Sequence, residues 1–459
     1  MSHRYAVLLL ALACSGGHKP VPTPKPAADA DPDGPHRDAV AAQLRPYLDG
    51  EVMTGVVVGL IELGKIEIYG FGVGPGGKPP NGRTLFDLGS MTKVYTGLLL
   101  ADAVQRREVD LEAPIADLMP PGVTVPTRDG VAITAKHLAL HSSGLPLFPP
   151  SLVQRKTPPD PFAGYGDDAF YQDVIATQLV TPPGKTIELS HFGTGLLAVA
   201  VGRKIGTGYA KALGDRVLAP LALRDTVLAL PAGAAARRAI GTDDELKPIS
   251  RWTWGALAGA GGLISDVRDL LLLVDAELDA AAGSKGTLRA AMRLSQEPQL
   301  DAAGDNEALG WNIDGAGRLW HDGSTGGFRG FIGFDPKTKR GVVVLASTQS
   351  ALVDTLGRTL FDILDGTAKP PAAAPTAATL ATYAGTYDFS GTDLLITANG
   401  KRLYLEGPGE PRHRMAPIGD RTFWIEGLKS AAKFEVEAST VKALVFKVGA
   451  KQIVAARKP

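Results

Sequence analysis

The stretch Leu85–Val104, "LFDLGSMTKVYTGLLLADAV", decides the fold because it places a short polar motif at the start of a strongly apolar segment. The apolar part predicts a buried helix whose first turn contains Gly89 and Ser90. Residues three apart on a helix lie on one face, so Lys93 can reach the hydroxyl of Ser90. A serine becomes a nucleophile when a nearby base takes its proton, and burial lowers the pKa of a lysine toward that role.

The spacing of Ser90 and Lys93 alone is weak support for a catalytic pair. The same Ser-x-x-Lys spacing occurs at Ser430–Lys433 and Ser439–Lys442, in a part of the chain that is predicted to be β-rich. What distinguishes Ser90 is the glycine before it and the apolar helix after it. On these residues alone, a helix-capping serine with a solvated lysine remains an equal alternative.

The composition bounds the class of protein. With 459 residues, the chain is long enough for two or three domains. Its 48 basic and 48 acidic residues give a formal net charge of zero, so there is no long-range field to attract nucleic acid, and we expect no such partner.

The first residues predict export. Residues 1–14 combine a basic start with an apolar run that is too short to span a bilayer, as in a signal peptide. Cys14 is the only cysteine, and its place after "LLLALA" is typical of the lipidation site of bacterial lipoproteins. An ordinary signal peptide with an incidental cysteine is the alternative. Residues 15–36, rich in Pro, Gly, Ala and Asp, predict a disordered tether that would hold the protein off the membrane of the cell envelope.

Hairpins are predicted at both ends of a large domain at residues 37–366. Val56–Gly72 alternates and predicts a hairpin that turns at Gly64-Lys65, and a second hairpin is predicted within Gly330–Thr348. Because strands stand at both ends with helices between them, we expect an α/β (α+β) domain with a mixed antiparallel sheet built from both ends and a helical subdomain.

Two apolar helices and a β-rich tail complete the expected organisation. Helices are predicted at Gly193–Gly206 and Ser265–Ala281, the second capped by Ser265 and Asp266. A Pro- and Ala-rich linker at 367–378 precedes residues 379–459, whose short alternating strands predict a small all-β, barrel-like domain.

Other catalytic signatures are absent from the sequence. There is no Gly-x-Ser-x-Gly nucleophile elbow. His137 and His141 have helical i, i+4 spacing but lack the glutamate of a metalloprotease motif, so we favour capping and packing roles over metal binding. We expect no metal or cofactor. His321, followed by "DGSTGG", is a candidate wall of a binding cleft.

Five stretches in order resemble the serine β-lactamase-like superfamily, particularly class C β-lactamases, D-Ala-D-Ala carboxypeptidases and related esterases. The resemblance covers about Asp38–Leu364, and the tail resembles the lipocalin-like domain appended to some members. The motifs are "LFDLGSMTKVYTGLLLADAVQRREVDLEAPIADLMP", "HLALHSSGLP", "PPGKTIELSHFGTGLLAVAVG", "GALAGAGGLISDVRDLLLLV" and "WHDGSTGGFRGFIGFDP".

The resemblance implies an acyl-enzyme mechanism. Ser90 would be the acylated nucleophile and Lys93 its proton partner, and the backbone N–H groups of Ser90 and Ser324 would form the oxyanion hole. The substrate would be a β-lactam, a D-amino-acid peptide or a carboxylic ester, including peptidoglycan-derived peptides. The residues expected to bind it are Ser190, His321, Gly323, Ser324 and Thr325.

One motif departs from the family pattern. Relatives have Tyr-Ser-Asn or Tyr-Ala-Asn where this chain has Leu189, Ser190 and His191. Leucine carries no proton, so the family's tyrosine relay is missing, and general acid–base help is worth about 10²–10⁴-fold. Either His191 takes over the proton transfer, or the protein is a pseudoenzyme that binds cell-wall peptides or a protein partner. The oligomeric state has no signal in the sequence.

Overall fold

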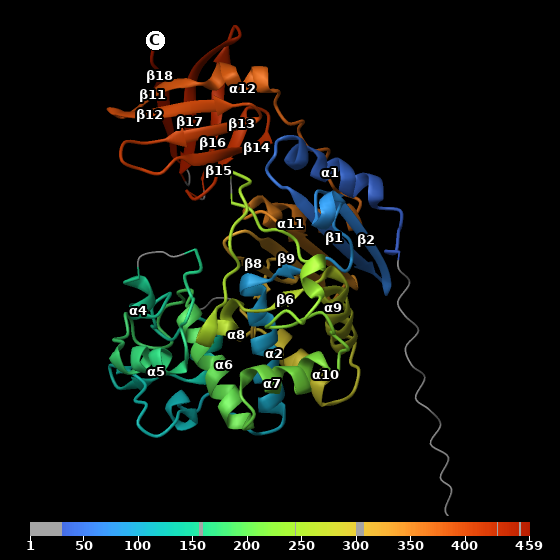
Figure 1. Ribbon diagram of the computed structural model, residues 1–459, viewed down its shortest axis with the longest axis vertical. Coiled ribbons are helices and arrows are strands. Elements are labelled where there is room, and N and C mark those ends of the chain that lie inside the picture. The colour runs from blue at the N-terminus through green and yellow to red at the C-terminus, as the bar shows by residue number, and fades with distance from the viewer. Residues whose placement is uncertain (1–29, 156–158, 244, 300–306, 429, 449–450) are drawn as a thin grey trace, which may run out of the picture.

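The computed structural model describes residues 30–155, 159–243, 245–299, 307–428, 430–448 and 451–459 (Figure 1). The predicted signal peptide, Cys14 and most of the predicted tether lie outside these residues. Within the described ranges, no helix combines the length and apolar character needed to cross a membrane.

A six-stranded antiparallel sheet forms the centre of the large domain. Strands from the start of the domain pair with strands from its end, which confirms that the sheet is built from both ends. In spatial order the strands are β2 (Lys65–Gly72), β1 (Gly55–Glu62), β10 (Arg340–Ala346), β9 (Arg329–Asp335), β8 (Leu319–Ser324) and β7 (Asn312–Ile313).

Both predicted hairpins are present in the sheet. β1 and β2 are joined by a two-residue turn at Leu63 and Gly64, which both have positive φ, at 50° and 80°. Lys65 already pairs with Glu62 in the sheet. The turn therefore lies one residue earlier than the predicted Gly64-Lys65. The second predicted hairpin is β9–β10.

Helices cover both faces of the sheet. Val56, Val58 and Leu60 of β1 pack in one core cluster with α1 (Arg37–Asp49) and α11 (Leu352–Leu364). The alternate residues of the same strand face α9 (Val267–Ala281), where Leu271 lies against Gly59. A strand buried on both faces needs apolar residues at nearly every position, which explains why β1 is continuously hydrophobic.

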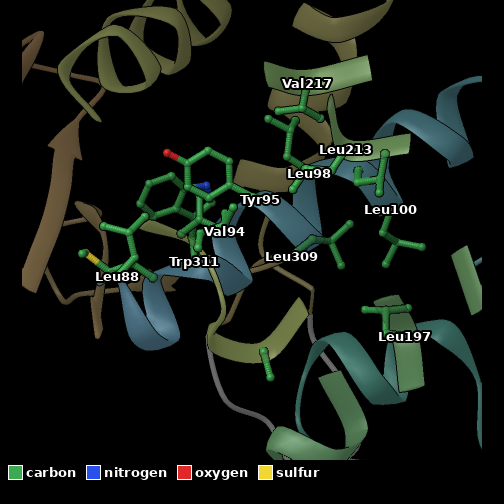
Figure 2. Close-up of a cluster of buried hydrophobic side chains, with 14 of the residues drawn as sticks. Leu88, Val94, Tyr95, Leu98, Leu100, Leu197, Leu213, Val217, Leu309 and Trp311 are labelled. Carbon is green, nitrogen blue, oxygen red and sulfur yellow. The ribbon is translucent and has the colours of Figure 1, made fainter. Parts of the chain in front are cut away.

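The helix predicted to contain Gly89 and Ser90 in its first turn is α2 (Thr92–Gln105), and these two residues instead form a 3-10 turn directly before it. α2 forms the core of the helical part. Twelve of its residues are buried, because it is surrounded by other helices and by the segment that contains Leu309 and Trp311 (Figure 2). Other α-helices in the described part of this domain are α3 (Ala135–Ala139), α4 (Pro150–Val153), α5 (Asp167–Ala176), α6 (His191–Ile205), α7 (Tyr209–Leu213), α8 (Ala258–Gly261) and α10 (Thr287–Gln296).

Ser265 and Asp266 were both predicted to cap α9, and only Asp266 does so. The side chain of Asp266 accepts the N–H of Asp269 at 2.9 Å and is the N-cap. Ser265 instead belongs to β6 (Ile264–Ser265), where its hydroxyl bonds Thr226 at 2.8 Å. Ser265 is held by a strand pairing and therefore stands before the helix.

The tail is a closed eight-stranded antiparallel barrel, as predicted, preceded by α12 (Ala377–Tyr383). Side chains fill its interior, and Tyr383 stacks on Phe434 with ring centroids 4.2 Å apart. The strands are β11 (Gly385–Phe389), β12 (Thr392–Asn399), β13 (Arg402–Glu406), β14 (His413–Gly419), β15 (Thr422–Ile425), β16 (Ser430–Glu437), β17 (Thr440–Val448) and β18 (Lys451–Arg457).

The two other Ser-x-x-Lys matches lie on this barrel. Ser430 and Lys433 are both on β16, where residues three apart point to opposite faces of the strand. Ser439 stands between β16 and β17, and Lys442 is on β17. Neither pair has the helical setting that brings a lysine to a serine.

Two adjacent leucines of α9 test the sheet–helix packing. Leu271 is fully buried against β1, whereas Leu272 is 41% exposed. We expect Leu271→Ala to lower the free energy of unfolding by about 2–5 kcal/mol, because it leaves a cavity. Leu272→Ala on the same helix should cost less than about 1 kcal/mol. Urea denaturation measures both, and equal losses would contradict the assigned faces.

Candidate active site

Ser90 lies on a tight 3-10 turn, η2 (Gly89–Met91), between β3 (Phe86–Asp87) and α2. Gly89 has a φ of +52°, a conformation that other residues rarely adopt. A Cβ at Gly89 would lie 2.4 Å from the carbonyl oxygen of Ser324 on β8. Glycine is therefore required here on two counts, and it brings Ser90 directly beside the strand.

Lys93 meets Ser90 as the helical spacing predicts. Its Nζ lies 2.8 Å from the Oγ of Ser90. The same Nζ lies 3.2 Å from the carbonyl oxygen of Ala260 on α8 and 3.2 Å from Nδ1 of His191. The structure thus brings Ser90, Lys93 and His191 together.

The surroundings of Lys93 suit a neutral amine. The side chain is 3% exposed, and this burial lowers its pKa to about 7, while the charge of Asp322 acts in the opposite direction. A neutral amine has two N–H groups and one lone pair. The two N–H groups can donate to Ala260 and His191, which leaves the lone pair for the hydroxyl of Ser90.

His191 is the first residue of α6, and aromatic rings fix its orientation. Its ring stacks on Phe148 at 5.0 Å and meets Trp254 edge-on at 5.8 Å. Burial lowers its pKa well below the usual value, so the imidazole is neutral at pH 7. When Lys93 donates to Nδ1, the ring proton must be on Nε2, which then becomes a hydrogen-bond donor.

Ser190 has a structural role in capping a helix, and its expected role in substrate binding stays a prediction. Its side chain is fully buried and caps α6 by accepting the N–H of Gly193 at 2.9 Å. The hydroxyl donates to the carbonyl of Pro146 at 2.7 Å. Both functions of the hydroxyl are therefore used within the protein.

Gly323 is closely surrounded by backbone atoms, and its expected role in substrate binding stays a prediction. A Cβ at this position would lie 2.0 Å from the carbonyl oxygen of Leu88 and 2.8 Å from the amide nitrogen of Met91. The glycine on β8 therefore makes room for the turn that holds Ser90.

The other residues predicted to bind substrate lie on β8 or directly after it. Ser324 is partly exposed, and its backbone touches the Gly89 turn. Thr325 is buried, and its N–H donates to the carbonyl of Phe328 in the next turn. His321 lies two residues before Gly323 and lines a small cavity of about 30 Å³ with Lys93.

His141 is a site residue that sequence reasoning did not place. It lines the same cavity as Lys93 and His321, and its Nδ1 accepts the N–H of Ser190 at 3.3 Å. Burial lowers the pKa of His141 to about 3 and that of His321 to about 4, so both are neutral at pH 7. Their convergence depends on the tertiary fold, and no sequence spacing signals it. His137, by contrast, has the predicted capping role, in a reciprocal cap with Thr134.

Comparisons with known proteins identify the family to which the large domain belongs. Residues 40–365 match the family model described as Beta-lactamase. The beta-lactamase of Escherichia coli (strain K12) is 27% identical over 349 residues, which cover 68% of this chain and 88% of that protein. The D-alanyl-D-alanine-carboxypeptidase/endopeptidase AmpH of the same organism is 25% identical over 275 residues, covering 57% and 70%.

A solved structure extends the likeness to three dimensions. The class C beta lactamase from Rhodobacter sphaeroides superimposes with a TM-score of 0.61 at 26% identity, over 72% of this chain and 99% of that one. The chain therefore belongs to the beta-lactamase family. The resemblance predicted from the order of the motifs is confirmed.

The pKa of Lys93 gives a testable pH dependence. A base must be deprotonated, so the rate at which Ser90 reacts with an activated ester should rise with pH below about 7 and level off above it. Lys93→Arg should remove this rise, because a guanidinium stays charged. Stopped-flow measurements of the acylation rate between pH 5 and 9 test both expectations. This range extends about two pH units on either side of the expected pKa. A flat profile in the wild type would contradict a neutral Lys93 acting as the base.

Proposed function

We propose that this protein is a serine hydrolase that forms an acyl-enzyme on Ser90 with an amide or ester substrate. The observation that carries the proposal is the 2.8 Å contact between Ser90 Oγ and the Nζ of a buried Lys93. Membership of the beta-lactamase family supports it. The substrate is a small molecule or peptide: a β-lactam, a D-amino-acid peptide, including one derived from peptidoglycan, or a carboxylic ester.

In the acylation step, Lys93 accepts the proton of Ser90 while Oγ attacks the carbonyl carbon of the substrate. The negative charge that forms on the carbonyl oxygen is stabilised by the backbone N–H groups of Ser90 and Ser324, which lie on the adjoining turn and strand. The bond to the leaving nitrogen or oxygen then breaks, and the acyl group stays on Oγ.

His191 supplies the proton to the leaving group. After acylation begins, Lys93 is an ammonium that donates to Nδ1 of His191 at 3.2 Å. Transfer of that proton to Nδ1 allows Nε2–H to protonate the leaving atom, so the imidazole ends neutral. Its lowered pKa favours rapid release of the proton. Deacylation runs these transfers in reverse: Nε2 of His191 takes a proton from the attacking water, Nδ1 returns its proton to Lys93, and Lys93 protonates the Oγ of Ser90 as the acyl bond breaks.

Export and lipidation belong to the same proposal. The pattern around Cys14 supports a lipoprotein whose folded part faces the periplasm or the exterior, with membrane contact only through the lipid. A location in the cell envelope suits a protein that acts on peptidoglycan-derived peptides.

A non-catalytic protein that binds cell-wall peptides or a protein partner is the second candidate. It is favoured by Leu189, which stands at the position of the family tyrosine, carries no titratable group and is 52% exposed. The labelling experiment below separates the two candidates.

The acyl-enzyme is tested by mass spectrometry of the intact protein with a small panel of β-lactams and activated esters. We expect one acyl adduct on Ser90 in the wild type and no adduct in Ser90→Ala. Ser430→Ala, in the barrel, should label like the wild type. Equal labelling of the wild type and Ser90→Ala, or no labelling of either, would favour the binding protein.

The role of His191 is tested by restoring the family residues. His191→Asn removes the proton carrier and should lower kcat/KM by about 10²–10⁴-fold. Adding Leu189→Tyr to His191→Asn recreates the tyrosine and asparagine of the relatives and should recover part of the loss. Full activity of the single His191→Asn variant would show that the imidazole transfers no proton.

A further inference from the structure

Two arginines of the barrel hold one segment of the large domain, residues 241–254, which is described except for residue 244. Arg412 pairs with the carboxylate of Glu245 and lies over the ring of Tyr404, 4.0 Å from its centroid. Arg402 donates to the carbonyl oxygen of Glu245 at 2.8 Å and to the carboxylate of Glu51 at 2.8 Å. Figure 1 shows this yellow-green segment reaching the barrel.

The same segment lies against the turn that follows Ser324. The N–H of Thr242 donates to the carbonyl of Gly327 at 3.2 Å. A Cβ at Gly326 would lie 2.6 Å from Ile249 and 2.9 Å from Trp252, so both side chains are in close contact with that turn. Ser324 is the last residue of β8, and Thr325 links it to residues 326 and 327.

The far end of the segment reaches the catalytic groups. Arg251 lies 3.9 Å from Asp87, three residues before Ser90. Trp254 meets the ring of His191, and Trp252 contacts Trp254 with ring centroids 6.1 Å apart. One segment therefore touches the barrel, the turn after β8 and the neighbours of Ser90 and His191.

The barrel is attached to the large domain by contacts other than those with Glu245. Arg414 is buried and donates to the carbonyl of Gly50 at 2.8 Å. Ser350 donates to the carboxylate of Glu426 at 2.5 Å. Ala416 is fully buried in the core cluster formed by α1, β1 and α11. Apolar burial and buried hydrogen bonds hold the barrel in place, whereas the contacts with Glu245 lie at the edge of this interface.

We propose that the barrel is a positioning element of the active site: Arg412 and Arg402 hold the 241–254 segment through Glu245, and the segment in turn fixes the Gly326-Gly327 turn and the rings beside His191. This inference rests on the proposed function of Ser90. It assigns the barrel a role in catalysis without any barrel residue touching the substrate. Small displacements at a catalytic site lower rates strongly, so a support of this kind controls kcat/KM.

The experiment compares Arg412→Ala, Glu245→Ala and the double variant in the full chain. Glu245 also pairs with Lys247 at 2.6 Å, so the double variant separates the contact with the barrel from that local pair. The matched control is Arg457→Ala, because Arg457 donates to the carbonyls of Thr382 and Ala384 within the barrel and its helix. Arg412→Lys keeps the charge and tests rescue.

Two readouts are measured: hydrogen exchange by mass spectrometry, and kcat/KM with an activated ester. We expect Arg412→Ala to speed hydrogen exchange in residues 241–254 and 324–330, because the segment loses its contact with the barrel. It should also lower kcat/KM by about ten-fold, because the catalytic groups are displaced. Glu245→Ala should do the same, the double variant should lose little more, and Arg412→Lys should recover most of the rate. Global unfolding should change little, because exposed ion pairs contribute little to stability.

Unchanged exchange in 241–254 and 324–330 with Arg412→Ala, or the same effect from Arg457→Ala, would overturn the proposal. If the wild type forms no acyl-enzyme, the proposed function fails, and the exchange measurement still decides whether the barrel holds the segment.

Discussion

The close approach of β8 to the turn before α2 is the constraint on which the rest of the site depends. Two glycines allow it: Gly89, whose Cβ would meet Ser324, and Gly323, whose Cβ would meet Leu88. The backbone of β8 and the backbone of the turn are in direct contact here, so Ser90 lies at the junction of the sheet and the buried helix. Because α2 is packed on all sides, the side chain of Lys93 can only extend within the interior, toward Ser90.

Burial then determines the chemistry of the site. A lysine withdrawn from water loses much of its preference for the charged form, and three imidazoles near it are kept neutral for the same reason. The site therefore combines a neutral amine with a hydroxyl and a neutral imidazole, the protonation states that transfer of a proton from serine requires. Nδ1 of His191 lies 3.2 Å from the Nζ of Lys93, and the aromatic rings around the imidazole hold it in position.

Local patterns predicted much of the architecture. The alternation in Val56–Gly72 and the Gly-Lys turn signal predicted a hairpin to within one residue, because strand alternation and turn chemistry are properties of neighbouring residues. The barrel was predicted for the same reason. The contacts of Ser190 with Pro146 and of Gly323 with Leu88 were not predictable, because each joins segments that are far apart in the sequence.

The sequence by itself determined the family, the order of the elements and the pairing of Ser90 with Lys93, since helical spacing places residues three apart on one face. Only the tertiary structure decided which other groups join that pair. His141, His191 and Trp254 come from different segments, and the barrel arginines meet Glu245 across more than 150 residues of chain. Such contacts arise from packing over long sequence separations, which local patterns of residues do not encode.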